Sequence, residues 1–525
     1  MSAITDLVDH AEPREVPVRD GMVVASHPLA VDAGAAALRA GGTAVDACVS
    51  AAAVLGVVDP TSAGIGGDCF ALVWDAARRE LHGFNGSGRA PAAASLGDLR
   101  RRGLEQVPDR GLLAVTVPGA VDAWTQLLDR FGRRRFDQAL EPAICAAREG
   151  FAVSPVVGRD WAASAGPLRE GTGTDAYLPV PAVGQRVAQP TLAATLEALA
   201  RGGRDAFYVG AFADRLDALS RAHEGWIRAE DLGAHRGEWV APLEGIYRGH
   251  SVYQMPPNAR GLVVLEALAL LDEFPLGDLS PQQRTHLQLE AFKIAFEDVR
   301  EAVGDPARSR AGALLEFDRI DARVADLEVR RERAEVGPRG PGGSRAVIVA
   351  AVDQEGNCCA LSSNIGRRFG AAVVVDGVCL HSRGAFFVTD EEHPAALRPS
   401  ARPYHTILPA MVFRGQRPWL VFGAGGDPSL QAQVQLLVHL VDGGLSLRDA
   451  IDAPRFGWVG GDRVRLEEGI DPATARGLRE RGHRLDDAGH GGFGDVQAIL
   501  LDEALEGASD PRKDGRVARV PASKD

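Results

Sequence analysis

The stretch Gly337–Ser363 reads GPRGPGGSRAVIVAAVDQEGNCCALSS. Glycines and prolines crowd residues 337–343, which neither a helix nor a central strand tolerates, so we expect an exposed, mobile loop there. Residues 346–352 are wholly apolar and rich in β-branched side chains, a pattern typical of a buried strand. Residues 353–357 have turn composition, and residues 358–363 resemble a returning strand. The sequence therefore predicts a buried hairpin that directly follows a loop.

Composition limits the function classes. The chain has 525 residues, enough for one large domain or two closely packed halves, and a formal net charge of -13. Without a basic face, neither nucleic acid nor an anionic membrane is an expected partner. The segment Met1–Val24 lacks the apolar run of a signal peptide, and the six cysteines lack metal-type spacing, so we expect buried thiols in a reducing cytoplasm.

No cofactor and no metal are predicted. The glycine-rich residues 61–68 precede a predicted strand, whereas nucleotide-binding loops follow one, so they do not indicate a nucleotide site. The expected partner is a small-molecule substrate, and the composition is compatible with a homo-oligomer.

Local signals elsewhere predict a mixture of helices and strands. The alanine-rich residues 31–58 are expected to form two helices, the second capped by Thr43 and Asp46. Residues 247–253 are expected to form one strand, and the pair at residues 285 and 288 to cap a further helix.

Several stretches in one order resemble the γ-glutamyltranspeptidase family, and they extend over most of the chain. They are residues 64–74, 117–153, 247–273, 286–306, 363–387, 402–426 and 450–456. The resemblance implies an α+β fold, the four-layer αββα sandwich of N-terminal nucleophile hydrolases. It also implies a large-subunit-like segment 1–345 that ends in the junction loop, and a small-subunit-like segment 346–525. Both segments are expected to form one intertwined domain.

The same resemblance assigns a chemical role to residue 346. In the family, a threonine seven positions before an aspartate attacks its own preceding peptide bond, and its freed amine becomes the general base. Counting back from Asp353 gives Ala346, whose side chain has no atom able to attack.

Three interpretations of Ala346 remain open at the level of sequence. In the first, the chain is an uncleaved, inactive precursor form in which threonine has been replaced, either naturally or by design. In the second, Ser344 attacks in place of residue 346. In the third, the chain is a non-catalytic binding protein. Ser344 is the least favoured, because two residues along a strand displace an atom by roughly 6–7 Å.

The resemblance also implies the residues of the site. The catalytic positions are Ala346, Asn364 and the oxyanion glycines Gly425 and Gly426. The substrate-binding positions are Ser87, Arg89, Gly366, His405, Thr406 and Asp427.

The expected substrate is not a γ-glutamyl compound. Transpeptidases carry an arginine for the glutamyl carboxylate where this chain has Ser87, an asparagine at Gly366 and an acid for the ammonium group at Ala385. At roughly 1.5–3 kcal/mol per charged hydrogen bond, losing two such bonds weakens binding about a hundredfold or more. The resemblance is therefore to a non-glutamyl branch that cleaves an acyl bond, either an amide or a C–C bond next to a keto group, as in antibiotic precursor synthesis.

Overall fold

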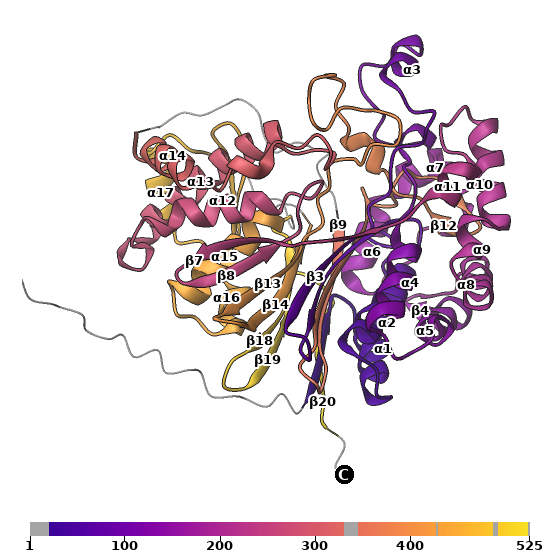
Figure 1. The fold of residues 1–525 in the computed structure, drawn as a ribbon, viewed down its shortest axis with the longest axis horizontal. Helices are drawn as coiled ribbons and strands as arrows, with labels where there is room; N and C mark the ends of the chain where they lie inside the picture. Colours follow the sequence, from indigo (N-terminus) through magenta and orange to yellow (C-terminus); the bar gives the residue numbers. More distant parts are fainter. Residues whose placement is uncertain (1–19, 330–344, 427–428, 487–491, 523–525) are drawn as a thin grey trace, which may run out of the picture.

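The computed structural model describes residues 20–329, 345–426, 429–486 and 492–522. Two sheets lie face to face in the middle of the molecule, and every strand pair within them is antiparallel (Figure 1). In spatial order the first sheet contains β20 (Arg516–Val520), β1 (Gly21–Ala25), β9 (Arg345–Val352), β10 (Cys358–Gly366), β2 (Asp68–Asp75), β3 (Glu80–Asn85) and β6 (Glu238–Val240). The second contains β19 (Leu505–Ser509), β18 (Asp495–Leu501), β14 (Arg417–Gly425), β13 (Pro409–Arg414), β8 (His250–Gln254) and β7 (Leu243–Tyr247).

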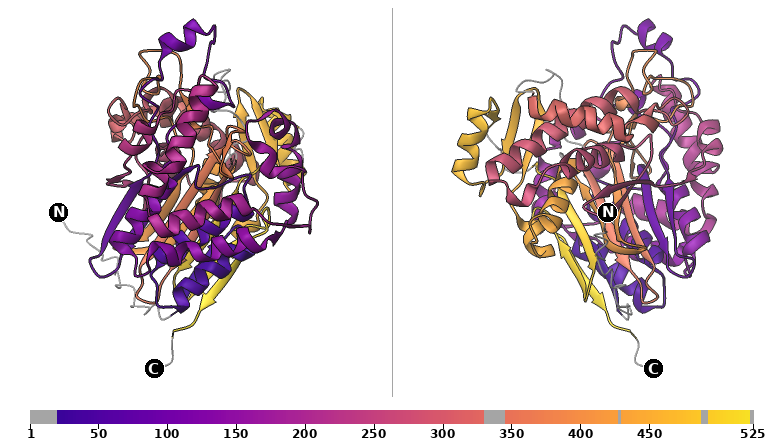
Figure 2. Two further views of the ribbon diagram at one scale, coloured as in Figure 1. Left: turned by 90° about the vertical axis from the view of Figure 1, so that its right-hand side faces the viewer. Right: turned by 60° about the vertical axis from the view of Figure 1, so that its left-hand side comes forward.

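Helices cover the outer face of each sheet (Figures 1 and 2). The first sheet is covered by α1 (Pro28–Arg39), α2 (Ala44–Val58) and α4 (Ala120–Phe131), with α5 (Phe136–Glu149) and α8 (Pro190–Gly202) farther out. The second is covered by α12 (Gly261–Asp272), α15 (Ser429–Val441) and α16 (Leu447–Asp452), and α13 (Pro281–Ala302) and α14 (Phe317–Val329) pack on α12. The four layers confirm the predicted α+β fold, an αββα sandwich.

Strand β9 lies between β1 and β10, and both of its faces are buried. Residues 347, 349 and 351 pack beneath the helices of the first sheet, whereas Ala346, Ala350 and Val352 pack between the two sheets. Burial on both faces explains why the strand is apolar without alternation. The predicted hairpin is confirmed, since β9 ends at Val352 and β10 begins at Cys358.

Strands from both sides of residue 345 contribute to both sheets. The first described strand, β1, pairs with the last one, β20, and also with β9. The predicted junction loop itself, including Ser344, lies outside the described residues.

Two local predictions are corrected. Residues 247–253 form two strands rather than one, because Arg248 and Gly249 have φ angles of 49° and 76° and make a hairpin turn. Helix α13 begins at Pro281 with a capping box of Ser280 and Gln283, so residue 285 lies inside the helix. By contrast, α1 and α2 and the Thr43 capping box are confirmed. No helix in the described ranges is both long and apolar enough to cross a membrane.

Candidate active site

Ala346 lies at a close contact between the two sheets. Its side chain belongs to the core between them and is 5% exposed. A Cβ atom on Gly425, in the facing strand β14, would overlap the carbonyl oxygen of Ala346 and would lie 2.8 Å from Asp495 Oδ1. Only glycine allows this approach, and the structure thus brings position 346 against the predicted oxyanion segment.

Gly426 follows at the end of β14. Its φ angle of 73° is one that glycine adopts freely, and its carbonyl oxygen accepts a hydrogen bond of 2.9 Å from Ser429 N at the start of α15. Backbone N–H groups near a helix N-terminus favour negative charge, as an oxyanion requires. The predicted substrate-binding residue Asp427 lies outside the described residues.

Asn364 lies beside Ala346 on the neighbouring strand β10. Val347 pairs with Ser363 and Arg345 with Gly366, so Ala346 stands opposite the irregularity that contains Asn364. Asn364 Oδ1 accepts hydrogen bonds from Gly366 N and from Arg383 Nη2. Gly366 has a φ angle of 85°, and a Cβ there would lie 2.6 Å from Ser382 Oγ. The backbone N–H of Gly366 and the side chain of Arg383 therefore orient Asn364 together.

Asp68 is the centre of a buried polar cluster. It pairs with Asn364 across β2 and β10, and its Oδ2 accepts a hydrogen bond of 2.9 Å from His405 Nε2. His381 Nδ1 lies 3.1 Å and Arg383 Nε 3.9 Å from the same oxygen, and all four side chains are fully buried. The cluster thus joins strand β2 to two segments that are more than 300 residues farther along the chain.

Burial and the contacts among these side chains together set the charges in the cluster. Burial raises the pKa of Asp68, but His381 and His405 outweigh this effect and hold the pKa well below its usual value. Burial and the nearby Arg383 charge lower the pKa of His405 to about 3, so this histidine is neutral. Burial lowers the pKa of Arg383 to about 10, which still leaves the guanidinium charged at neutral pH.

His405 has both ring nitrogens engaged by the protein. Its Nδ1 accepts a 3.1 Å hydrogen bond from Thr406 N, while Nε2 donates to Asp68. The Thr406 hydroxyl in turn accepts from Arg383 Nη1 at 3.2 Å. These contacts hold His405 in place within the site.

Ser87 is linked to the same cluster through its neighbours. Asn258 Nδ2 donates to Ser87 Oγ at 3.0 Å, and the N–H of Gly88 donates to Asp68 Oδ1 at 3.0 Å. Arg89 differs from the other predicted residues. Its side chain is 42% exposed and pairs with Glu238 at 2.7 Å, away from the Asp68 cluster.

The structure therefore brings most of the predicted residues together and adds others. The predicted ones in this region are Ser87, Ala346, Asn364, Gly366, His405, Thr406, Gly425 and Gly426. Sequence reasoning missed Asp68, Asn258, His381 and Arg383. No spacing rule connects these positions, and only the sheet pairing and the buried hydrogen bonds reveal them.

Another group has the composition of a metal site. Ligand atoms of His286, Glu290 and His483 lie within 4.8 Å of one another, between α13 and the segment after α17 (Pro472–Glu480). His286 Nδ1 and His483 Nε2 are 2.8 Å apart, and Lys293 Nζ donates to Glu290 at 2.6 Å. Because hydrogen bonds already join these side chains, the group is accounted for as a structural network.

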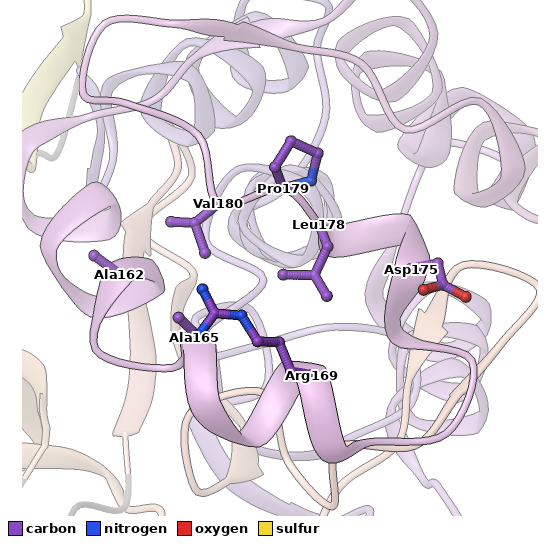
Figure 3. Close-up of a pocket in the computed structure, with 7 residues that line it drawn as sticks. All are labelled: Ala162, Ala165, Arg169, Asp175, Leu178, Pro179 and Val180. Atoms are coloured by element: carbon purple, nitrogen blue, oxygen red, sulfur yellow. The ribbon is translucent and has the colours of Figure 1, made fainter.

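The structure also has a hollow outside the region of the predicted site residues. It has a volume of about 640 Å³. Side chains from α6 (Pro155–Ala162), α7 (Ala165–Glu170), η2 (Thr174–Tyr177) and the loop that follows η2 line it, as Figure 3 shows. Arg169 and Asp175 are its charged residues. None of the predicted site residues lines this hollow, so it is separate from the site around Ala346.

Comparison with known proteins identifies the family. A model of gamma-glutamyltranspeptidase matches residues 30–520. The glutathione hydrolase-like YwrD proenzyme of Bacillus subtilis is 34% identical, with 95% of this chain and 98% of the relative covered. The oxamate amidohydrolase proenzyme of Klebsiella pneumoniae is 33% identical, again with 95% and 98% covered.

A solved structure supports the same family assignment. The cephalosporin acylase of Bacillus halodurans is 36% identical and superposes with a TM-score of 0.89 over 98% of this chain and 99% of its own. These relatives are named as hydrolases and an acylase. The chain therefore belongs to the gamma-glutamyltranspeptidase family.

Proposed function

We propose that the site around Ala346 is an acyl-cleavage site for a small substrate that is not a γ-glutamyl compound, and that the chain with alanine at this position is an uncleaved, inactive precursor form. One observation carries the proposal: residue 346 packs against Gly425 between the sheets but lacks a hydroxyl group. Relatives named as an acylase and an oxamate amidohydrolase support a non-glutamyl acyl substrate. The absence of a carboxylate-binding arginine at Ser87 supports it too.

The proposed chemistry uses the hydroxyl oxygen that Ala346 lacks in two steps, self-cleavage of the chain and attack on the substrate. With threonine at position 346, the hydroxyl oxygen adds to the carbonyl carbon of residue 345, the C–N bond breaks, and the hydroxyl proton passes to the nitrogen. Water then hydrolyses the resulting ester and leaves a free amine on residue 346. That amine accepts the hydroxyl proton when the same oxygen attacks a substrate, while the Gly425 and Gly426 N–H groups bind the oxyanion.

The test compares the unmodified chain with Ala346→Thr and Ala346→Val on a denaturing gel. Valine matches threonine in shape but has no hydroxyl, so it controls for packing at this buried position. We expect Ala346→Thr alone to split into residues 1–345 and 346–525. The cleaved variant should hydrolyse simple acyl anilides about a hundredfold faster than a γ-glutamyl anilide. Faster turnover of the γ-glutamyl compound would refute the substrate class.

The alternative function is a non-catalytic binding protein, which the alanine itself favours. No splitting of Ala346→Thr would support that alternative. Splitting of the unmodified chain, with a new terminus at Ser344, would instead make that serine the nucleophile.

The bond that the active form cleaves is either an amide or a C–C bond next to a keto group. The second choice would place the protein in secondary metabolism. Analysis of the products of Ala346→Thr by mass spectrometry distinguishes the two, because only amide cleavage releases an amine.

A further inference from the structure

Asp68 and Asn364 lie on the same face of the first sheet as Ala346. Phe70, two residues after Asp68, packs between the two sheets. Ala360, four residues before Asn364, and Ala346 pack there too. Side chains alternate along a strand, and Asp68 pairs with Asn364 in regular register across β2 and β10. The Asp68 carboxylate and the Asn364 amide therefore face the space between the sheets, where residue 346 also lies.

The hydrogen bonds of Asn364 decide how its amide group is turned. The two groups that contact Asn364 Oδ1 are the N–H of Gly366 and Nη2 of Arg383. Both of these groups only donate, so an amide nitrogen in the same place would face two donors. The amide oxygen must occupy this side, and the NH2 group of Asn364 is turned away from both donors.

Arg383 connects the Asn364 amide to Asp68. The Arg383 side chain is fully buried, and its Nη1 donates to Thr406 Oγ1 at 3.2 Å. Its Nε lies 3.9 Å from Asp68 Oδ2, and among the described residues no other carboxylate lies within 4.0 Å of this guanidinium group. Because a buried charge without a counter-ion is strongly destabilising, Asp68 keeps Arg383 in the place from which it reaches Asn364.

The Asp68 carboxylate is itself held from several sides. Its Oδ1 accepts a 3.0 Å hydrogen bond from Gly88 N, and its Oδ2 accepts one of 2.9 Å from His405 Nε2. His381 Nδ1 lies 3.1 Å from the same Oδ2. In addition, the Ser363 hydroxyl donates to the backbone carbonyl oxygen of Asp68 at 2.9 Å. The carboxylate therefore has one fixed orientation, which it imposes on the guanidinium group beside it.

We propose that Asp68 and Arg383 are positioning residues, which turn the NH2 group of Asn364 toward the hydroxyl oxygen of a threonine at position 346. Asn364 then donates a hydrogen bond to that oxygen and stabilises the negative charge that develops as the hydroxyl proton leaves. No atom passes between the amide and the reacting groups. The inference rests on the proposed function and adds to it two residues that act only through Asn364.

The first experiment measures, on a denaturing gel, how fast Ala346→Thr splits when the pair is changed. Arg383→Met has nearly the same length but no N–H group, so we expect splitting to be slowed about tenfold to a hundredfold. Asp68→Asn leaves the buried guanidinium group without its carboxylate and should slow splitting by a similar factor. Arg383→Lys keeps the charge and a donor, so it should be slowed less than about tenfold. Unchanged splitting of Arg383→Met would overturn the proposal.

A double-mutant cycle with Asn364→Ala separates positioning from support of the fold. Once the amide is gone, Arg383→Met should slow splitting by less than about twofold, although it should still lower the melting temperature. Equal slowing with and without the amide would mean that Arg383 only supports the fold, and the proposal would then be wrong.

The matched control is Arg248→Met on the β7–β8 hairpin. Arg248 forms a partly buried ion pair of 3.0 Å with Asp442, and its side chain is 26% exposed. Loss of this pair should lower the melting temperature and leave the splitting rate unchanged, because the hairpin has no contact with Asn364.

The second experiment uses the unmodified chain and needs no reaction at residue 346. Crystal structures of this chain and of its Arg383→Met variant compare the Asn364 side chain. We expect the amide to rotate, or to adopt more than one conformation, once Arg383 no longer holds its oxygen. An amide that keeps its orientation would contradict the proposal. A failure of Ala346→Thr to split would count against the proposed function, whereas these structures would still decide whether Arg383 positions Asn364.

Discussion

At the scale of single residues, the site depends on the absence of a side chain at Gly425. The backbones of β14 and β9 touch there, and an added Cβ would overlap the carbonyl oxygen of Ala346. We predict that Gly425→Ala separates the two strands and lowers the free energy of unfolding by about 1–3 kcal/mol. In the Ala346→Thr background, the same change should abolish self-splitting, because the scissile bond moves away from its donors. Denaturant unfolding and a denaturing gel measure the two effects.

Gly166→Ala provides the control for this substitution. Gly166 lies in α7 and has no atom within 4 Å of the added Cβ. Alanine should therefore be neutral there, or stabilising by up to about 1 kcal/mol. If Gly425→Ala were as harmless as Gly166→Ala, the close contact at position 346 would not exist in solution.

At the scale of elements, Asp353 fastens the β9–β10 hairpin to helix α2. Its Oδ1 accepts from the N–H groups of Glu355 and Asn357, and its Oδ2 accepts from Asn357 Nδ2 and from Ala44 N, each at 2.9–3.0 Å. Asp353→Ala removes all four bonds at a buried position and should cost about 2–4 kcal/mol of unfolding free energy. Glu355→Ala is the matched control, since its ion pair with Arg133 is exposed and should contribute less than about 1 kcal/mol. Equal melting temperatures of the two variants would refute this role.

Elements with local signals could be predicted from the sequence. The β9–β10 hairpin has turn residues between two apolar runs, and α2 has its own capping box, so both could be predicted without knowledge of their distant contacts. The turn at Arg248 and Gly249 was missed because the apolar residues on both sides continue the strand pattern across it. The start of α13 was missed because two capping pairs lie five residues apart, and only the one at Ser280 is used.

The candidate site could be predicted only where a family resemblance supplied the positions. Asp68 and His405 are hydrogen-bonded although 337 residues separate them in the sequence. Their residue types alone do not predict this contact. Such information exists in the packing of the sheets, not in any one stretch of sequence.

At the scale of the whole molecule, buried histidines should make the fold sensitive to acid. Burial lowers the pKa of His235, His286 and His439 to about 4, and of His405 and His483 to about 3. Unfolded histidine titrates near 6.5, so between this value and about 4 the unfolded state binds more protons. The stability that these neutral histidines contribute to the fold is complete above pH 6.5 and is lost as the pH falls. Burial raises the pKa of Glu266 and Asp353. These two carboxyl groups therefore lower the stability of the fold as the pH rises above about 4.5.

His439→Gln isolates one of these contributions. Burial, followed by the charges of Arg284 and Arg455, lowers the pKa of His439, so protonation opposes folding. A glutamine cannot titrate, and at pH 5 the variant should therefore recover about 1–2 kcal/mol relative to the parent chain. At pH 8, where the histidine is neutral in both states, the two proteins should differ by less than about 0.5 kcal/mol. Thermal unfolding of both proteins at pH 8, 6 and 5 measures this, and parallel curves would mean that His439 is protonated as easily in the fold as outside it.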